Sequence, residues 1–288
     1  MVNLGRLHTR DGNGTTAYQL HEALFQAAQT RTEASVDRRT ISFGNIVHRG
    51  DDHREIVRWL WTSLLADGLR ALCRAGRWSE ALHRAEQHNG LGHRLFDGRQ
   101  IAIIAHCAAH NHAEAIRLTE ASATPTTWEE AVAACMKVIC LTWAGRPTNS
   151  ATAAMVDAYL ALDPAPEHAV FHVRLGLSVA DLAHDTHDTQ PVIRMIERSA
   201  LDAADAYAAR DACTDRTPSP LTEAATHALN KTVRAAGLGT TMPPRVLDNL
   251  MQSVQRSETA LARALATGPQ TSGSIPRVTS RCPIVLCE

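Results

Sequence analysis

The stretch Gly76-Arg-Trp-Ser-Glu-Ala81 separates two apolar, alanine-rich segments, and variants of it recur twice along the chain. His110-Asn-His-Ala-Glu-Ala115 begins 34 residues later, and Gly145-Arg-Pro-Thr-Asn-Ser150 begins 35 residues after that. Each stretch follows one apolar segment and precedes another. Self-similarity at this period is typical of helix-hairpin repeats, in which one unit cannot bury its apolar face alone. The pattern therefore predicts antiparallel helix pairs that stack.

The composition of the chain favours helices throughout. Alanine, leucine and arginine are abundant, whereas phenylalanine (4) and tyrosine (3) are scarce. The abundant residues lose little freedom in a helix, while β-branched and aromatic residues favour strands. Only residues 40–47 alternate as a strand would, and they could equally form a loop. We therefore predict an all-α fold of stacked antiparallel helix pairs.

Capping residues, glycines and prolines divide the 288 residues into expected elements. Residues 1–14 are expected to be a mobile, turn-rich start, and 31–52 a long loop. The expected helices are 16–30, 54–75, 78–89, 97–109, 112–122, 127–144, 149–162, 167–183, 191–211, 221–236 and 244–266. The predicted domains are an N-terminal segment (1–52), a helical-repeat domain (53–266) and a flexible C-terminal tail with two cysteines (267–288).

The recurring stretches resemble the centre of the tetratricopeptide repeat, which reads small-x-aromatic-x-Glu-Ala between its two helices. The first stretch matches at Gly76, Trp78, Glu80 and Ala81. The second keeps the Glu-Ala pair and has histidine at the small and aromatic positions. The third keeps its glycine and loses the Glu-Ala pair. Pro125 and Pro164 fall where such repeats close their second helix, so the resemblance covers roughly residues 64–164.

This resemblance implies a function as well as a fold. In tetratricopeptide-like stacks the first helix of each pair lines a concave face that binds a protein or peptide. Arginines on such a face can hold a peptide carboxylate bidentately. The alternative is that these side chains are ordinary solvated surface charges. The predicted partner-binding groove comprises Arg70, Arg74, Arg99, Gln100, Lys137 and Arg174.

Charge and motifs restrict the other function classes. The 29 basic and 30 acidic residues give a net charge of −1 with no strongly basic block, so no nucleic-acid partner is expected. No apolar run is long enough to span a membrane and the start has no signal-peptide core, which favours a cytoplasmic location. Nucleotide-binding and nucleophile motifs are missing, so no enzyme activity and no cofactor are expected. The rarity of lysine beside abundant alanine and arginine is typical of an actinobacterial protein.

Two histidine pairs have the i, i+4 spacing that places two imidazoles on one helical face, as a zinc site requires. They are His106 with His110, and His168 with His172. Neither pair is completed by a further ligand motif, and a site needs three or four ligands. We therefore predict hydrogen-bonded or partly exposed histidines and no metal, with zinc as the alternative.

The end of the chain has an unusual composition. Thr279 and Ser280 precede Cys282 and Cys287 after a Gly/Ser-rich segment. This resembles the modified end of a lanthipeptide precursor, in which cysteines attack dehydrated Ser/Thr, although a precursor leader is normally short. The alternatives are a disordered tail or docking of residues 284–286 on the last helix. Our leading hypothesis is a regulatory or adaptor protein that binds a protein or peptide. The alternative is an accessory or carrier protein in a peptide natural-product pathway whose tail is modified.

Overall fold

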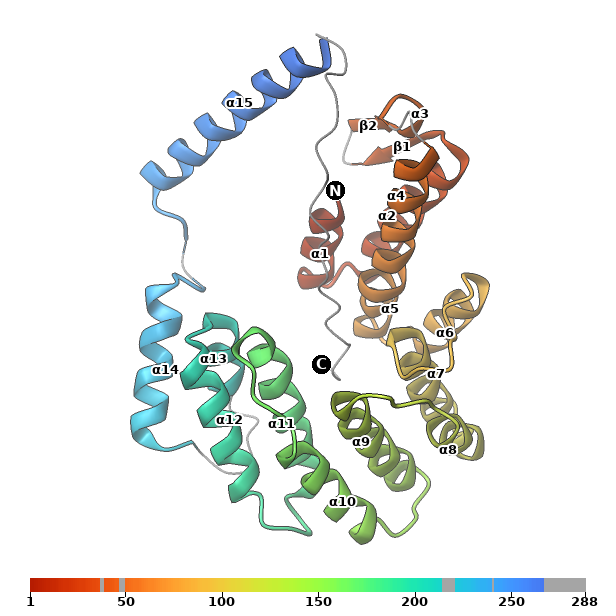
Figure 1. The fold of residues 1–288 in the computed structure, drawn as a ribbon, viewed down its shortest axis with the longest axis vertical. Helices are drawn as coiled ribbons and strands as arrows, with labels where there is room; N and C mark the ends of the chain where they lie inside the picture. The colour runs from red at the N-terminus through yellow and green to blue at the C-terminus, as the bar shows by residue number, and fades with distance from the viewer. Residues whose placement is uncertain (37–38, 47–49, 214–220, 240, 267–288) are drawn as a thin grey trace.

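A computed structural model describes residues 1–36, 39–46, 50–213, 221–239 and 241–266. Helices dominate these residues, so the predicted all-α class is confirmed (Figure 1). The N-terminal elements are α1 (Val2–Arg10), α2 (Gly14–Thr30), β1 (Glu33–Val36), β2 (Arg39–Ser42), α3 (Phe43–Ile46), α4 (Gly50–Ser63), the π-helix η1 (Leu64–Gly68) and α5 (Leu69–Arg74). They are followed by α6 (Trp78–Gln87), α7 (Asp97–Ala108), α8 (His112–Glu120), α9 (Thr127–Trp143), α10 (Asn149–Leu160), the 3-10 helix η2 (Pro166–His168), α11 (Ala169–Ala183), α12 (Gln190–Ala203), α13 (Ala206–Ala212), α14 (Glu223–Ala235) and α15 (Pro244–Ala266).

The three recurring stretches form the same helix-ending turn. Gly76, His110 and Gly145 all adopt the left-handed conformation, with φ of 72°, 59° and 64°. In each turn this residue donates its N–H to the carbonyl three residues back, and the next residue donates to the carbonyl five back. This Schellman-type pattern satisfies carbonyls at the helix end and reverses the chain. Glycine adopts it without a Cβ clash, whereas His110 bears a steric cost.

The alanine that follows each of the first two turns is a close-packing position. Ala81 and Ala115 are both completely buried. The third copy is different, because α10 begins four residues after Gly145 and not two. The completely buried residue there is Thr152, and Ser150 is exposed. The longer turn through Pro147 thus shifts the buried register by two residues.

A fourth copy of this turn precedes the three found in the sequence. Gly12 has φ of 80°, Asn13 donates to the carbonyl of His8, and Ala17 is completely buried. The expectation of a mobile start at residues 1–14 is therefore wrong, because α1 packs on α2. An added Cβ at Gly5 would lie 2.4 Å from Nε2 of the buried His21, so this helix crossing depends on glycine.

The segment expected as a long loop at 31–52 contains a β-hairpin. β1 and β2 are antiparallel, with Ala34 opposite Ile41 and Val36 opposite Arg39. Ala34 and Val36 are buried, as is Phe43 directly after β2. Alternation of small or β-branched apolar residues with polar ones gives this strand pair one buried face. Because the hairpin lies between α2 and α4, the fourth turn is more than one repeat period away from the stretch at Gly76. A search of the sequence for repeats at a constant period therefore does not find it.

Two expected helices are interrupted. The helix predicted at 54–75 begins at Gly50 and passes through η1, whose wider turn separates α4 from α5. The helix predicted at 191–211 breaks at Ala204, which has φ of 49°. Asp205 then caps α13, because its side chain accepts hydrogen bonds from the N–H groups of Tyr207 and Ala208.

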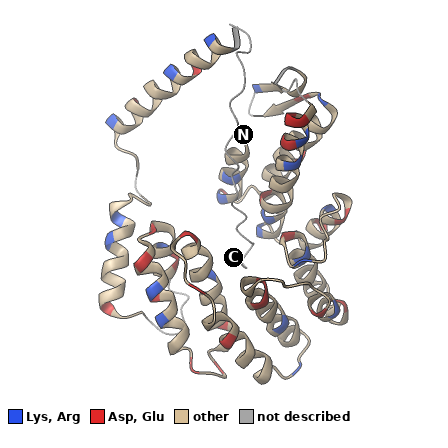
Figure 2. Ribbon diagram, viewed as in Figure 1, with Lys and Arg blue, Asp and Glu red and all other residues tan. Residues whose placement is uncertain are grey.

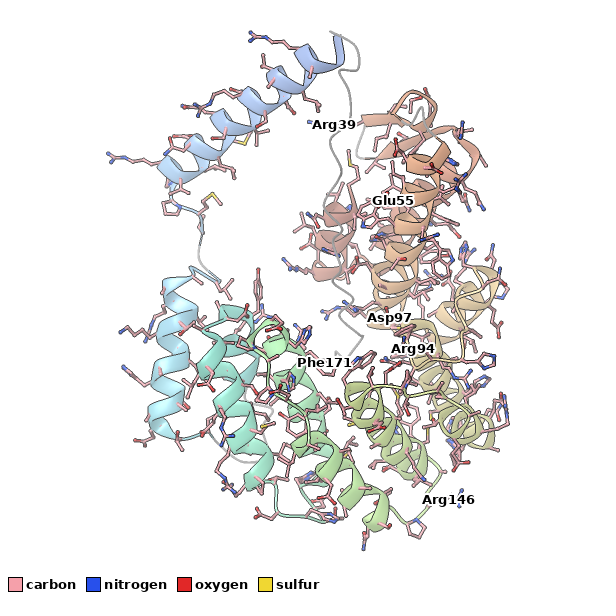
Figure 3. The ribbon with its side chains drawn as sticks, in the orientation of Figure 1. Arg39, Glu55, Arg94, Asp97, Arg146 and Phe171 are labelled. Carbon is pink, nitrogen blue, oxygen red and sulfur yellow. The ribbon has the colours of Figure 1, made fainter. Side chains whose placement is uncertain are left out.

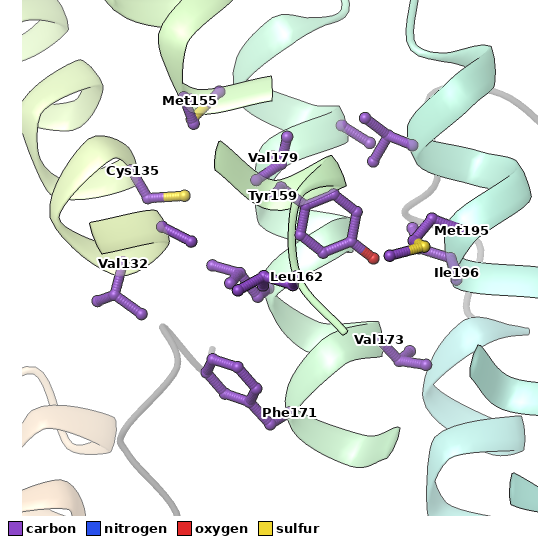
Figure 4. Close-up of a cluster of buried hydrophobic side chains, with 14 of the residues drawn as sticks. Val132, Cys135, Met155, Tyr159, Leu162, Phe171, Val173, Val179, Met195 and Ile196 are labelled. Carbon is purple, nitrogen blue, oxygen red and sulfur yellow. The ribbon is translucent and has the colours of Figure 1, made fainter. Parts of the chain in front are cut away.

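Consecutive helices from α5 to α12 pack on each other, and α7 also contacts α9, which contacts α11. The helices follow a curved path, with α9 and α11 nearer its centre than α10 (Figure 1). Buried apolar residues form two clusters, which meet at α7. The N-terminal cluster runs from Val2 to Ile101, so residues before 53 share a core with the helices that follow. The central cluster runs from Leu95 to Leu229 and includes the completely buried Tyr159 (Figure 4).

Candidate functional site

Three aromatic side chains lie in a row across alternate helices. Phe96 immediately precedes α7, Trp128 is the second residue of α9, and Phe171 lies in the first turn of α11. The rings of Phe96 and Trp128 are stacked with centroids 6.3 Å apart, and those of Trp128 and Phe171 meet edge to face at 6.2 Å. Phe96 and Trp128 are half-buried, whereas Phe171 is buried. We call these three residues the aromatic row.

An ion pair borders the aromatic row at its α7 end. Nε and Nη2 of Arg94 donate to the two carboxylate oxygens of Glu129 at 2.9 and 2.8 Å. The guanidinium also lies over the Phe96 ring, 4.5 Å from its centroid. Glu129 is completely buried, while 43% of the Arg94 side chain is exposed. This bidentate pair therefore fixes the chain before α7 to the start of α9 and leaves part of the guanidinium accessible.

The environment keeps Glu129 ionised. Burial raises the pKa of the Glu129 carboxyl, but hydrogen bonds from Arg94 and from the Thr126 hydroxyl (2.6 Å) outweigh it, and the pKa is lowered. Thr126 is the N-cap residue of α9, although its hydroxyl donates to Glu129 and caps no backbone N–H. Figure 3 shows that Arg94, Asp97 and Phe171 lie on the inner side of the curved path of helices.

Three of the predicted groove residues stabilise the fold through their own contacts. Gln100 is 1% exposed and donates to the carbonyl of Leu95, so its expected place on a surface is wrong. Arg99 donates to the hydroxyl of Ser122 and to two backbone carbonyls. Arg174 on α11 pairs with Asp211 on α13, with Nε 2.7 Å from Oδ2. Sequence periodicity placed these residues on the right helices but gave no indication of these contacts.

The other three groove residues differ in exposure. Arg74 and Lys137 are exposed, on α5 and α9. Arg70 is half-buried, and its Nε has no hydrogen-bond partner among the described residues. Basic and acidic residues are interspersed along the whole path (Figure 2). Exposed charge alone therefore does not mark one face as the site, and the aromatic row becomes the stronger candidate.

The two histidine pairs do not share helical faces in the expected way. His110 lies in the left-handed turn after α7, which ends at Ala108, and its ring packs against that of His112. His106 is on α7, where its Nδ1 lies 3.4 Å from the amide of Asn111. His168 is exposed in η2, while His172 is buried in α11. Among the described residues, no group of three His, Cys, Asp or Glu side chains could hold a metal ion.

The proposed modification sites Thr279, Ser280, Cys282 and Cys287 lie outside the described residues. Within the described part of the chain, no helix combines the length and apolar character needed to cross a membrane. Comparison of the chain with protein-family models, curated proteins and solved structures gives no significant match.

Proposed function

We propose that this protein is a tetratricopeptide-like scaffold that binds a protein or peptide along the aromatic row, in a regulatory or adaptor role. The observation that carries this proposal is the row itself, since three aromatic rings from three contacting helices form one continuous strip. Aromatic residues with neighbouring arginine dominate the energetics of protein interfaces.

The stacked-pair arrangement is part of the same proposal. It is supported by the turn geometry shared by Gly12, Gly76, His110 and Gly145, and by the contacts of α7 with α9 and of α9 with α11. In such a stack, equivalent positions of successive first helices are neighbours. Phe96, Trp128 and Phe171 occupy nearly equivalent positions, at or next to the N-terminal ends of α7, α9 and α11.

The geometry also revises what the partner is expected to contribute. Because Arg94 is already paired with Glu129, it offers N–H donors with little uncompensated charge. Arg99 and Arg174 are likewise engaged in contacts within the fold. We therefore expect the partner to place apolar or aromatic side chains against the half-buried rings of Phe96 and Trp128, since Phe171 is buried. Hydrogen bonds to Arg94 would add to these contacts, and a carboxylate clamp would contribute less.

Selection from a random-peptide display library on the immobilised full chain tests this function. Trp128→Ala should abolish capture of the selected peptides, because it removes the central ring of the row. The matched control is Trp143→Ala at the other end of α9, where the side chain is 49% exposed and outside the row. Peptides that bind both variants equally, or that lose binding only in the control, would remove the aromatic row as the site.

A further inference from the structure

The last described helix, α15, exposes a long apolar face. Its 23 residues are exposed as far as their side chains are described. The exposed fractions of the large apolar side chains reach 47% for Leu250, 41% for Val254 and 60% for Leu261. At about 100° per residue, these side chains fall on one side of the helix. Arg245 and Arg256 fall on the opposite side.

An amphipathic helix in this position needs a partner surface. Most of the stability of helices in proteins comes from packing of their apolar face and not from helix propensity. Large contiguous apolar patches are also rare on monomers. An ion pair between Arg39 and Glu258 links α15 to the β-hairpin, and its 3.9 Å separation between two exposed side chains makes it weak. Figure 1 shows α15 apart from the other helices.

The charge of α15 argues against a lipid surface. Three arginines are offset by Asp248 and Glu258, which leaves a net charge of only +1. Interfacial helices that bind anionic lipid carry many basic residues on the polar face. The helix therefore lacks the electrostatic attraction that would hold it on a membrane.

The distribution of side-chain size along α15 fits a second copy of the same helix. Residues at coiled-coil spacing in the N-terminal half are large: Leu247, Leu250 and Val254. Those in the C-terminal half are Ser257, Leu261 and Ala264. Helix pairs pack best when large residues face small ones, so that the layers interdigitate.

We propose that α15 pairs with α15 of a second copy in antiparallel orientation. Antiparallel pairing places Leu247 opposite Ala264, Leu250 opposite Leu261 and Val254 opposite Ser257, and the two-fold axis repeats each layer. A parallel pair would instead place Ser257 on Ser257 and Ala264 on Ala264, which leaves those layers underfilled. The antiparallel arrangement sets the small residues Ala264 and Ser257 against Leu247 and Val254, packs Leu250 on Leu261, and is self-complementary, as a two-fold interface must be.

Sedimentation equilibrium of the full chain over a range of concentrations tests the dimer. The unsubstituted protein should show a concentration-dependent monomer–dimer equilibrium. Leu250→Glu should raise the dimer dissociation constant by at least about tenfold, because it places a carboxylate in the seam of each copy. Gln252→Glu adds the same charge on the opposite face and should leave the dissociation constant unchanged. Far-UV circular dichroism should show that the helical content of α1–α14 is retained in both variants.

Photo-crosslinking determines the orientation. A benzophenone amino acid at position 250, in an equal mixture of ¹⁵N-labelled and unlabelled protein, identifies links between copies. Trypsin cleaves after Arg245, Arg256 and Arg263, so residues 246–256 and 257–263 are released as separate peptides. Antiparallel pairing should link peptide 246–256 to peptide 257–263 of the other copy.

Three outcomes would overturn the proposal. The first is a monomer at every concentration. The second is a dimer that Leu250→Glu and Gln252→Glu weaken equally, and the third is a link between two 246–256 peptides. Cosedimentation of a monomer with vesicles of phosphatidylcholine and phosphatidylglycerol, lost in Leu250→Glu, would assign the apolar face to lipid instead.

Discussion

Gly176→Ala should destabilise the fold, although the same change stabilises most helices. Gly176 lies inside α11, where replacing glycine by alanine normally gains about 1 kcal/mol. Here an added Cβ would lie 2.3 Å from the hydroxyl oxygen of Tyr159 and 2.6 Å from Cγ1 of Ile196. Both distances are far below the contact separation of about 3.5–4.0 Å. Glycine is therefore the residue that lets α10 and α12 approach α11.

The size of the effect follows from what must move. Overpacking a well-packed core costs about 1–3 kcal/mol. Displacing Tyr159 also breaks the hydrogen bond that its hydroxyl donates to the carbonyl of His172 at 3.1 Å, worth about 1 kcal/mol. After the gain in helix propensity is subtracted, the free energy of unfolding should fall by about 1–3 kcal/mol.

Urea unfolding followed by circular dichroism measures this change. Tyr159→Phe provides the control, because it removes the atom that the new Cβ would meet first. In that background Gly176→Ala should cost less by about 1 kcal/mol, as expected for two residues in contact. If Gly176→Ala raised the stability, or if the cost were identical with and without the Tyr159 hydroxyl, the close approach of these helices would be refuted.

Three further predictions concern the repeat register, two buried histidines and the buried Glu129. Ala81→Arg should lower the free energy of unfolding by about 2–4 kcal/mol through overpacking and an unpaired charge. Ser79→Arg, on the exposed side of the same helix, should leave the melting temperature nearly unchanged. Equal effects of the two substitutions would contradict the repeat register that places Ala81 between the helices. Burial lowers the pKa of both His21 and His172 below the ordinary 6.5. The free energy of unfolding should therefore be largest above pH 6.5 and decrease as the pH falls below that value, because the unfolded chain then binds more protons than the folded chain. Denaturant midpoints between pH 5 and 8 measure this, and a constant midpoint would count against neutral buried imidazoles. Glu129→Gln should lower the melting temperature, since it weakens the bidentate bond from Arg94; an unchanged melting curve would show that this pair contributes nothing to the fold.

The sequence by itself determined the helical class and most of the helix ends. Glycines at 76 and 145 stop helices because the left-handed conformation is accessible to them, and this requires only local backbone sterics. The start of α9 near Thr126 was predictable from acidic residues in the first turn, for the same local reason. Ala81 and Ala115 hold the same position in the first two recurring stretches, and both are completely buried.

Only the tertiary structure decided which side chains are available for binding. Helical spacing placed Arg99, Gln100 and Arg174 on a common set of helices, but their partners are Ser122, Leu95 and Asp211, between 5 and 37 residues away. The rings of the aromatic row are likewise separated by whole helices in the sequence, so no local pattern indicated that they touch. Contacts of this kind depend on how helices cross and on which residues are small enough to permit it. Local propensity determines where each helix begins and ends, whereas packing between helices determines which face remains exposed to a partner.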